Sequence, residues 1–320
     1  MTNKIIAVAP MLDWTDRHAR YFLRLMSQHT LLYTEMINTG AILRGDRDYC
    51  LGFDNSEHPI ALQLGGSSPH ALAQCAVIAE QYRYDEINLN VGCPSDRVQS
   101  GHFGACLMQE PQRIADCVAA MQQAVSIPIT IKCRNGIDRI ESYHFLKKFV
   151  ATTAPAGCQT FIVHARNAWL QGLSPKENRH VPPLNYEFVY RLKQDFPELT
   201  IIINGGIQTT EQIKQHLHHV DGVMIGREAY HNPYCLATID RDFYHDDHAI
   251  PSRQTIAERY IDYIEKQLKN NVKLHYMTRH ILGLFQGQAG ARNWRRYLSE
   301  HSHQATADAQ VVREALRLIN

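Results

Sequence analysis

Eight short apolar runs precede residue 230, and each has the length and the Ile, Val and Thr content of a β-strand. The runs are Ile5–Met11, Leu31–Ile37, Ile60–Gly66, Glu86–Cys93, Pro128–Arg134, Thr160–Arg166, Leu199–Gly206 and Gly222–Arg227. Segments with helical spacing separate most of them, among them Arg17–Ser27, Pro69–Gln81, Pro111–Ala124, Glu141–Ala151, Tyr186–Asp195 and Glu211–His218. Because strands that alternate with helices pair in parallel, the pattern predicts an α/β fold, a (β/α)8 TIM barrel.

A doubly wound open sheet is the alternative to the barrel. Such a sheet usually carries a glycine-rich dinucleotide turn after its first strand. Residues 9–13 read Ala-Pro-Met-Leu-Asp, which is not a turn of that kind, so the barrel is the favoured fold.

The chain after the barrel reads as a linker followed by helices. Residues 238–251 are charged, lack a helical apolar period and end in Pro251, which predicts a linker. Ser252 is the predicted cap of a helix that runs to about Asn270, and further helical patterns cover about Lys273–Phe285, Ala291–Ser299 and Ala305–Ile319. We therefore predict a barrel domain over residues 1–240 and a small helical domain over residues 250–320.

Composition excludes several classes of protein. No apolar run approaches the length of a membrane span, and the first residues lead directly into a predicted strand, so neither a membrane segment nor a signal peptide is expected. The eight cysteines show no CxxC pair and no zinc spacing, which indicates reduced thiols in a cytoplasmic protein. We expect a monomer that holds no metal. Four of these cysteines are predicted core residues: Cys75, Cys117, Cys133 and Cys158.

Polar groups occur at nearly every carboxyl end of the predicted strands. They include Pro10-Met11, Glu35-Met36, Gln63 with Gly65-Gly66, Asn90 with Cys93, Lys132 with Arg134, His164 with Arg166, Asn204-Gly205-Gly206 and Gly226-Arg227. Any strand end turns polar where it meets water, but the amino ends show no comparable set. In a barrel the carboxyl ends converge on one face, where active sites lie.

Cys93 follows the strand that begins at Glu86, between Gly92 and Pro94. A thiol just past a strand end is presented to solvent or ligand, and the alternative is a buried structural thiol. The glycines after the seventh and eighth strands, in Asn204-Gly205-Gly206 and Gly226-Arg227, are typical of a barrel phosphate site, although two tight turns would look the same.

Three further strand-end residues suit a flavin attached to that phosphate. The amide of Gln63 can both donate to and accept from the pyrimidine edge, and Lys132 can hold the negative charge of the reduced ring. His164 can contact the phosphate or the ring edge, and backbone of Pro10, Met11 and Leu12 can cover the ring. Together with the phosphate loops, these residues indicate FMN.

The predicted helical domain contains a basic segment. Residues 266–298 hold seven Lys or Arg and no Asp or Glu, with Trp294 and Tyr297 among the arginines. Such a segment suits contact with RNA phosphates and bases, and the alternative is a solvated helix face.

The motifs as a set resemble the tRNA-dihydrouridine synthases. They are Ala9 to Met11 with Thr15-Asp16, Asn88 to Pro94, Lys132 to Gly136, His164 to Arg166, Asn204-Gly205-Gly206 and Gly226-Arg227. Residues 166–184 resemble the A subgroup of this family. The chain departs from many relatives at Asp13-Trp14, where a small residue is common, and this affects the expected packing over the flavin.

The resemblance implies reduction of uridine to 5,6-dihydrouridine in tRNA by bound FMN, with NADPH as the reductant, at D-loop positions 20 and 20a. A hydride passes from FMN N5 to C6 and a proton from an acid to C5, and a thiol of ordinary pKa suits that acid. Cys93 is the predicted acid, Asn90 the contact to the uracil edge, and Cys106 a second candidate acid. The predicted tRNA contacts are Glu177, His180, Asn293 and Arg296, beside Lys176 and Arg179.

Two other functions fit parts of the pattern. A flavin reductase acting on free pyrimidines shares the barrel, FMN and cysteine but has no need of the basic helices. A noncatalytic tRNA binder or chaperone needs the basic helices but not Cys93.

Overall fold

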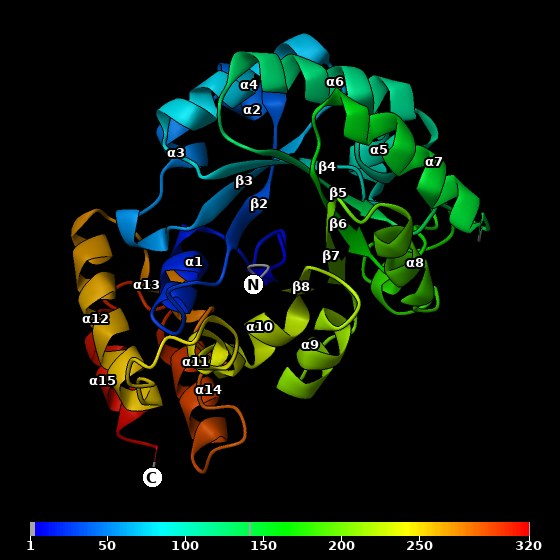
Figure 1. Ribbon diagram of the computed structural model, residues 1–320. Helices are drawn as coiled ribbons and strands as arrows, with labels where there is room; N and C mark the ends of the chain where they lie inside the picture. Colours follow the sequence, from blue (N-terminus) through cyan, green and yellow to red (C-terminus); the bar gives the residue numbers. More distant parts are fainter. Residues whose placement is uncertain (1–3, 141, 320) are drawn as a thin grey trace. The chain divides into compact units, whose positions relative to one another are not determined.

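The computed structural model describes residues 4–140 and 142–319 (Figure 1). Its chain divides into two compact units. The first comprises the described residues up to Met11 together with Leu31–Phe53 and His58–Gly226, and the second comprises Leu12–Thr30, Asp54–Glu57 and the residues from Arg227 onward.

Eight parallel strands form the first unit's sheet, in the order β1-β8-β7-β6-β5-β4-β3-β2. They are β1 (Ile5–Val8), β2 (Leu32–Asn38), β3 (Ile60–Gly65), β4 (Glu86–Asn90), β5 (Ile129–Arg134), β6 (Thr160–His164), β7 (Thr200–Asn204) and β8 (Gly222–Ile225). Leu31 closes the ring, because its N–H donates to Ile6 O and its carbonyl accepts from Val8 N–H, both at 2.9 Å. The predicted (β/α)8 barrel is therefore confirmed.

Helices cover the outer face of the strands, and Figure 1 shows α4, α6 and α7 along one side of the barrel. The helices of this unit are α2 (Thr39–Arg44), α3 (Arg47–Leu51), α4 (Pro69–Gln81), α5 (Asp96–Ser100), α6 (Pro111–Ala124), α7 (Tyr143–Thr153), α8 (Glu187–Asp195) and α9 (Thr210–Leu217), with 3-10 turns η2 (Gly104–Gln109), η3 (Ala154–Ala156) and η4 (Glu177–Arg179). Proline at the first turn and the Ser68 cap start α4 at its predicted residue. Glu141, the predicted start of α7, lies outside the described residues.

The barrel interior holds an apolar cluster and a group of buried polar residues. The apolar cluster consists of Ala7, Ala9, Tyr33, Ala61, Ile162, Ile202 and Met224. The polar group on β3, β4 and β5, here called the polar side, includes Gln63, Asn88, Asn90 and Thr130. Glu86, Asn88 and Asn90 are two residues apart, so the pleat of β4 directs all three to the same face.

The second unit is helical. Its elements are α1 (Arg17–Arg24), η1 (Asn55–Glu57), α10 (Arg227–His231), η5 (Pro233–Leu236), α11 (Ile239–Tyr244), α12 (Arg253–Lys269), α13 (Leu274–Thr278), α14 (Ala291–His301) and α15 (Gln310–Leu316). Ser252 caps α12 by accepting from Thr255 N–H at 3.0 Å, as predicted. No described helix has the length and apolar character needed to cross a membrane.

The prediction of a linker at residues 238–251 is wrong for the first half of this segment. Residues 239–244 form α11, in which Ile239 and Asp240 are buried. The Asp240 carboxylate accepts from Ser27 Oγ and from the Gln28 N–H, so the charge that suggested a solvated linker instead fixes a turn. The assignment of residues 1–240 to cofactor and 250–320 to tRNA stays a prediction.

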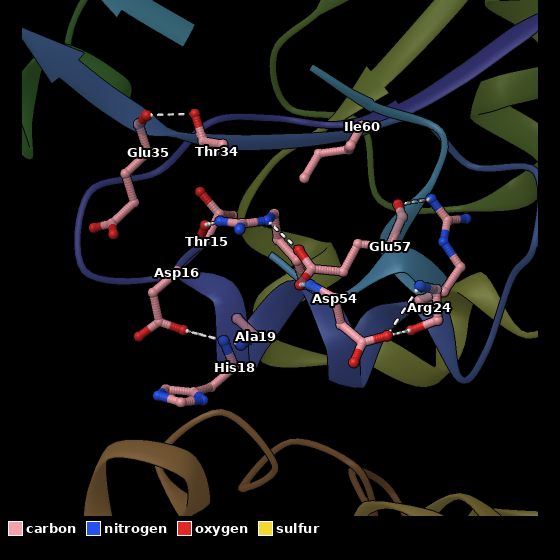
Figure 2. Close-up of polar contacts among 12 residues, drawn as sticks. Thr15, Asp16, His18, Ala19, Arg24, Thr34, Glu35, Asp54, Glu57 and Ile60 are labelled. Atoms are coloured by element: carbon pink, nitrogen blue, oxygen red, sulfur yellow. Dashed lines mark hydrogen bonds and ion pairs between the residues drawn. The ribbon is translucent and has the colours of Figure 1, made fainter. Parts of the chain in front are cut away.

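Buried and partly buried charges hold α1 within this unit. Asp16 caps α1, accepting from the N–H groups of His18 and Ala19 (Figure 2), and its other oxygen accepts from Arg279 at 2.6 Å. Arg20 Nε lies 2.6 Å from Glu57 Oε2, and both side chains are at most 5% exposed. A buried pair of this kind costs much when one partner is lost, because the other charge stays buried.

We expect Glu57→Gln to lower the free energy of unfolding by about 3 kcal/mol or more, since it leaves the Arg20 guanidinium uncompensated. The matched control is Glu265→Gln, which breaks an exposed pair with Arg313 and should cost about 1 kcal/mol at most. Urea unfolding followed by circular dichroism measures both. If both variants lost the same free energy of unfolding, burial of the Arg20–Glu57 pair would not add to the cost of breaking it.

Candidate active site

The turn after β4 is fixed by side chains from neighbouring strands. Asn90 Oδ1 accepts from the N–H groups of Gly92 and Cys93 at 3.1 and 2.9 Å. Arg134 Nε donates to Gly92 O at 3.0 Å, and Ala105 N–H donates to Cys93 O at 2.9 Å. The backbone of Cys93 is thus held on both sides.

The Cys93 side chain is half-buried, and its thiol donates to Ser95 Oγ at 3.6 Å. Gly104 makes the close approach of the next loop possible. It has φ +79°, and a Cβ added there would lie 2.6 Å from Cys93 O, so only glycine fits without displacement.

Five other thiols of the barrel unit are buried or hydrogen-bonded within their own segment. The four predicted core cysteines are buried: Cys75, Cys117, Cys133 and Cys158. Burial raises the pKa of Cys75 to about 11 and that of Cys133 to about 12. Cys106 is half-buried, and its thiol donates to Phe103 O in its own loop at 3.2 Å. Cys93 differs because its backbone joins a network that enters the barrel.

Gln63 and Asn90 lie side by side in that network. Asn90 Nδ2 donates to Gln63 Oε1 at 2.9 Å, and Gln63 Nε2 donates to Asn88 Oδ1 at 2.8 Å. Gln63 is 1% exposed and Asn90 9%. Each of the two amides keeps one N–H for a ligand.

Lys132 is one of the cations at these strand ends. It is paired in register with Asn90, and its amino group donates to Asn204 Oδ1 at 3.2 Å. Asn204 Nδ2 in turn donates to Met224 O at 2.8 Å, which fixes the orientation of the Asn204 amide. Burial, and next the charge of Arg134, lower the pKa of Lys132 to about 8.

The predicted phosphate loop after β7 has the glycine geometry that it needs. Gly205 and Gly206 have φ values of +124° and +72°, where other residues are strained. A Cβ on Gly205 would lie 2.9 Å from His164 Cδ2, so this turn packs on the His164 ring. Tyr186 OH donates to Gly205 O at 2.7 Å. The structure thus brings His164 and the Asn204–Gly206 turn together.

The other predicted cofactor residues lie at chain segments after β1 and β8. Met11 is partly buried and packs on the apolar cluster, and Pro10 precedes it, half-buried. Leu12 belongs to the second unit and is 70% exposed. Gly226 ends the first unit, and Arg227 begins α10 in the second.

The loop that holds Glu177 and His180 is tied to the Cys93 turn. Arg134 donates from Nη1 to Asn178 O at 3.0 Å while its Nε holds Gly92 O. Asn178 is fully buried, between the two predicted RNA contacts. The Glu177 carboxylate accepts from Ser174 N–H and Oγ at 2.8 and 2.6 Å, so it also shapes the loop.

One aromatic residue of the basic segment is not free to contact bases. Trp294 is fully buried, its Nε1–H donates to Ile281 O at 3.1 Å, and its ring packs on Phe285. The expected availability of Trp294 for RNA is therefore wrong, because a helix must bury one face. Tyr297 is partly exposed, donates to Glu314 and stacks on His301, and its contact with RNA stays a prediction. Asn293 and Arg296 are exposed on α14.

Sequence reasoning missed Arg134 and Asn178 as residues that hold the site. Arg134 was noted only as a strand-end cation, and its position two residues after Lys132 was the available signal. No local signal marked Asn178, since its burial depends on the folded loop. The alternation of polar and apolar residues from Glu86 to Asn90 did indicate that one face of β4 is polar.

One group among the described residues has the proximity of metal ligands: His29, Asp240 and Asp246, with ligand atoms within 4.8 Å. Existing interactions account for this proximity. Asp246 lies 2.8 Å from His29 Nε2 and 3.0 Å from His248 Nδ1. The expectation that the chain holds no metal stays a prediction.

Comparison with known proteins shows to which family the chain belongs. The family model described as dihydrouridine synthase matches residues 7–320. The chain is 60% identical over 312 residues to a tRNA-dihydrouridine(20/20a) synthase of Synechocystis sp., covering 98% of this chain and 93% of that protein. Proteins of the same name from Salmonella typhi and Vibrio vulnificus are 59% identical over 314 residues and 58% over 315, covering 98% of this chain and 94% and 96% of those proteins.

The chain belongs to the dihydrouridine synthase family of enzymes. The resemblance seen in the sequence, including that to the A subgroup, is confirmed by these matches.

The low pKa of Lys132 predicts a pH effect on stability. Between pH 8 and 10.5 an unfolded lysine keeps a proton that folded Lys132 has lost, so stability should rise with pH in this window. Lys132→Met should remove the cost of the buried charge, raising the unfolding free energy at pH 7 by about 3 kcal/mol at most, and should flatten that rise.

Thermal unfolding of ligand-free protein at several pH values measures this effect. Lys148→Met, at an exposed position on α7, is the control and should behave like the wild type. A Lys132→Met protein that is no more stable than wild type at pH 7 would contradict a partly buried ammonium whose desolvation destabilises the fold.

Proposed function

We propose that this enzyme reduces uridine to 5,6-dihydrouridine in tRNA at positions 20 and 20a, with FMN as bound cofactor and NADPH as reductant, in the cytoplasm. The observation that carries the proposal is the Cys93 turn, held by Asn90 and Arg134 at the carboxyl ends of the barrel strands. The relatives named tRNA-dihydrouridine(20/20a) synthases support the substrate and its positions. The eight unpaired cysteines agree with a reducing compartment.

The residues at the strand ends suit the binding of FMN, which when bound supplies the hydride. Gln63 keeps one amide N–H that suits a pyrimidine carbonyl oxygen, and Lys132 places a cation beside it on the rim formed by β3 to β7. Gly205 and Gly206, whose φ values are positive, leave this turn without side chains, which suits a phosphate site. The remaining contacts assigned to the cofactor are Pro10, Met11, Leu12, His164, Asn204, Gly226 and Arg227.

Cys93 supplies the proton. Its thiol is half-buried and donates to Ser95 Oγ, so the S–H group is within reach of a uracil ring brought to the rim. The second N–H of Asn90 is available for a uracil carbonyl oxygen. The turn hydrogen bonds keep Cys93 and Asn90 at a fixed spacing, so a uracil that reaches Asn90 meets the thiol in one orientation.

Binding of tRNA must offset the cost of bringing the uridine out of its stack, a few kcal/mol. Asn293 and Arg296 are exposed on α14, in a segment without acids, and suit phosphate contacts. Glu177 and His180 belong to the loop that Arg134 connects to the Cys93 turn. RNA that contacts this loop therefore binds to a segment that is hydrogen-bonded to the turn of the acid, Cys93.

We expect Cys93→Ala to reduce dihydrouridine formation about a hundredfold or more while flavin and tRNA binding persist. Lys132→Ala should instead weaken flavin retention. The assay is purified yellow protein with NADPH and unmodified tRNA, with dihydrouridine mapped by mass spectrometry. Cys106→Ala is the matched control, because its thiol is engaged within its own loop.

The same assay separates the other functions. Reduction of free uracil at the rate seen with tRNA would replace the proposal with a small-molecule flavin reductase. A colourless protein with RNA effects that survive Cys93→Ala would make it a noncatalytic RNA binder.

We expect Arg296→Ala to weaken tRNA binding and to reduce the slope of log affinity against log salt concentration by about one. The reason is the loss of one phosphate contact from an exposed cation on α14. Lys148→Ala, an exposed lysine on α7, serves as control and should leave the slope as in wild type. Identical salt slopes for the two variants would remove α14 from the RNA surface.

A further inference from the structure

A directed chain of hydrogen bonds runs through the polar side of the barrel. At its inner end Glu86 Oε1 accepts from Thr130 Oγ1 at 2.6 Å. Thr130 Oγ1 accepts from Asn88 Nδ2 at 2.8 Å, and Asn88 Oδ1 accepts from Gln63 Nε2 at 2.8 Å. Gln63 Oε1 then accepts from Asn90 Nδ2 at 2.9 Å. The chain crosses β3, β4 and β5 from Glu86 to the Asn90 that shapes the Cys93 turn.

Every donor in this chain points toward Glu86, and the two ends force that direction. The outer end begins at backbone N–H groups, which can only donate, so the oxygen of Asn90 must face them. The inner end is a carboxyl oxygen, which accepts whether or not the group is ionised at its other oxygen. The Thr130 hydroxyl has one proton and donates it to Glu86, so towards Asn88 it can only accept. Asn88 therefore directs its NH₂ group to Thr130 and its oxygen to Gln63.

If any one amide were rotated by 180°, its NH₂ group would face another donor on one side and its oxygen would face another acceptor on the other side. Gln63, Asn88 and Thr130 are buried, so water cannot satisfy the groups that such a reversal exposes. Bonds that run in one direction also strengthen one another. The orientation of the Gln63 amide is thus set from both ends, by the turn N–H groups through Asn90 and by Glu86, which is three hydrogen bonds away.

We propose that Glu86 is a positioning residue, which acts through Thr130 and Asn88 to fix the amide of Gln63 with its second N–H available at the rim. The proposal rests on the function proposed above, in which Gln63 meets a pyrimidine carbonyl. Glu86 itself touches no ligand: it lies at the amino end of β4, and Gln63 and Asn90 carry its effect.

Two further features agree with this role. Tyr33 OH donates to the same Glu86 oxygen at 2.7 Å, which steadies the acceptor without entering the chain. Burial raises the pKa of Glu86, so the barrel keeps a carboxyl group there at a cost that an apolar residue would avoid. A polar residue kept at such a cost has a positioning or functional use.

Thr130→Val tests the proposal, because it keeps the shape of the side chain and removes the hydroxyl that links Glu86 to Asn88. Thr130→Ser restores the link. Tyr33→Phe is the matched control, since it removes the other hydrogen bond to Glu86 Oε1 and leaves the chain intact. If Thr130→Val does not fold, Thr130→Ala removes the same hydroxyl without the added methyl group.

The first readout is the side-chain amide NMR spectrum of ¹⁵N-labelled, flavin-free protein. Thr130→Val should shift the Asn88 and Gln63 NH₂ signals, and Thr130→Ser and Tyr33→Phe should leave those of Gln63 in place. The second is the dissociation constant of FMN, measured by quenching of flavin fluorescence. We expect about a tenfold rise in Thr130→Val and less than a twofold change in the other two variants.

The two readouts distinguish failure of this proposal from failure of the proposed function. Unchanged Gln63 signals and an unchanged FMN dissociation constant in Thr130→Val would overturn the role of Glu86. A wild-type protein that binds no FMN would sink the proposed function, while the NMR readout would still decide whether Glu86 sets the orientation of Gln63.

Discussion

A closed barrel cannot leave polar groups in its interior unless they satisfy one another, and this constraint governs the structure around the Cys93 turn. Buried amides, two hydroxyls and a partly buried carboxyl from β2 to β5 meet as donor and acceptor at every step. The apolar cluster fills another part of the interior with side chains from β1, β2, β3, β6, β7 and β8 and from Ala9. The polar side ends at the rim, where Asn90 and Lys132 lie. The hydrogen bonds that satisfy the polar groups of the interior therefore also position the residues of the proposed site.

Lys132 shows what that arrangement costs. Its amino group is held by Asn204 in surroundings that lower its pKa to about 8, so the folded chain retains a cation that it would be more stable without. The carboxyl group of Glu86 is a similar case, since burial raises its pKa. Residues that oppose stability and are nevertheless held by dedicated partners are the ones that a ligand site needs.

Much of the fold follows from local patterns. Alternating strands and helices predicted the barrel, and helical spacing predicted α4 and α6 with the bounds that the structure shows. Cys93 was found because Gly92 and Pro94 end its strand. Long-range contacts could not be predicted in this way. Asp240 looked like a linker residue until its bonds to Ser27 and Gln28 were known, and Trp294 looked like a base-stacking residue although α14 buries it. That Arg134 joins the Cys93 turn to Asn178 likewise depends on the folded loop.

The burial of Trp294 has a practical consequence for spectroscopy. The chain has three tryptophans: Trp169 belongs to the barrel unit, and Trp14 and Trp294 belong to the helical unit. The indole of Trp294 is wholly enclosed and that of Trp14 is stacked on Tyr230, so each loses a distinct environment when the helices come apart. With Trp169 replaced by phenylalanine, tryptophan emission becomes a reporter of the helical unit alone. Comparison of its melting curve with that of the unaltered chain then shows, without an attached dye, whether the two units of this enzyme melt together.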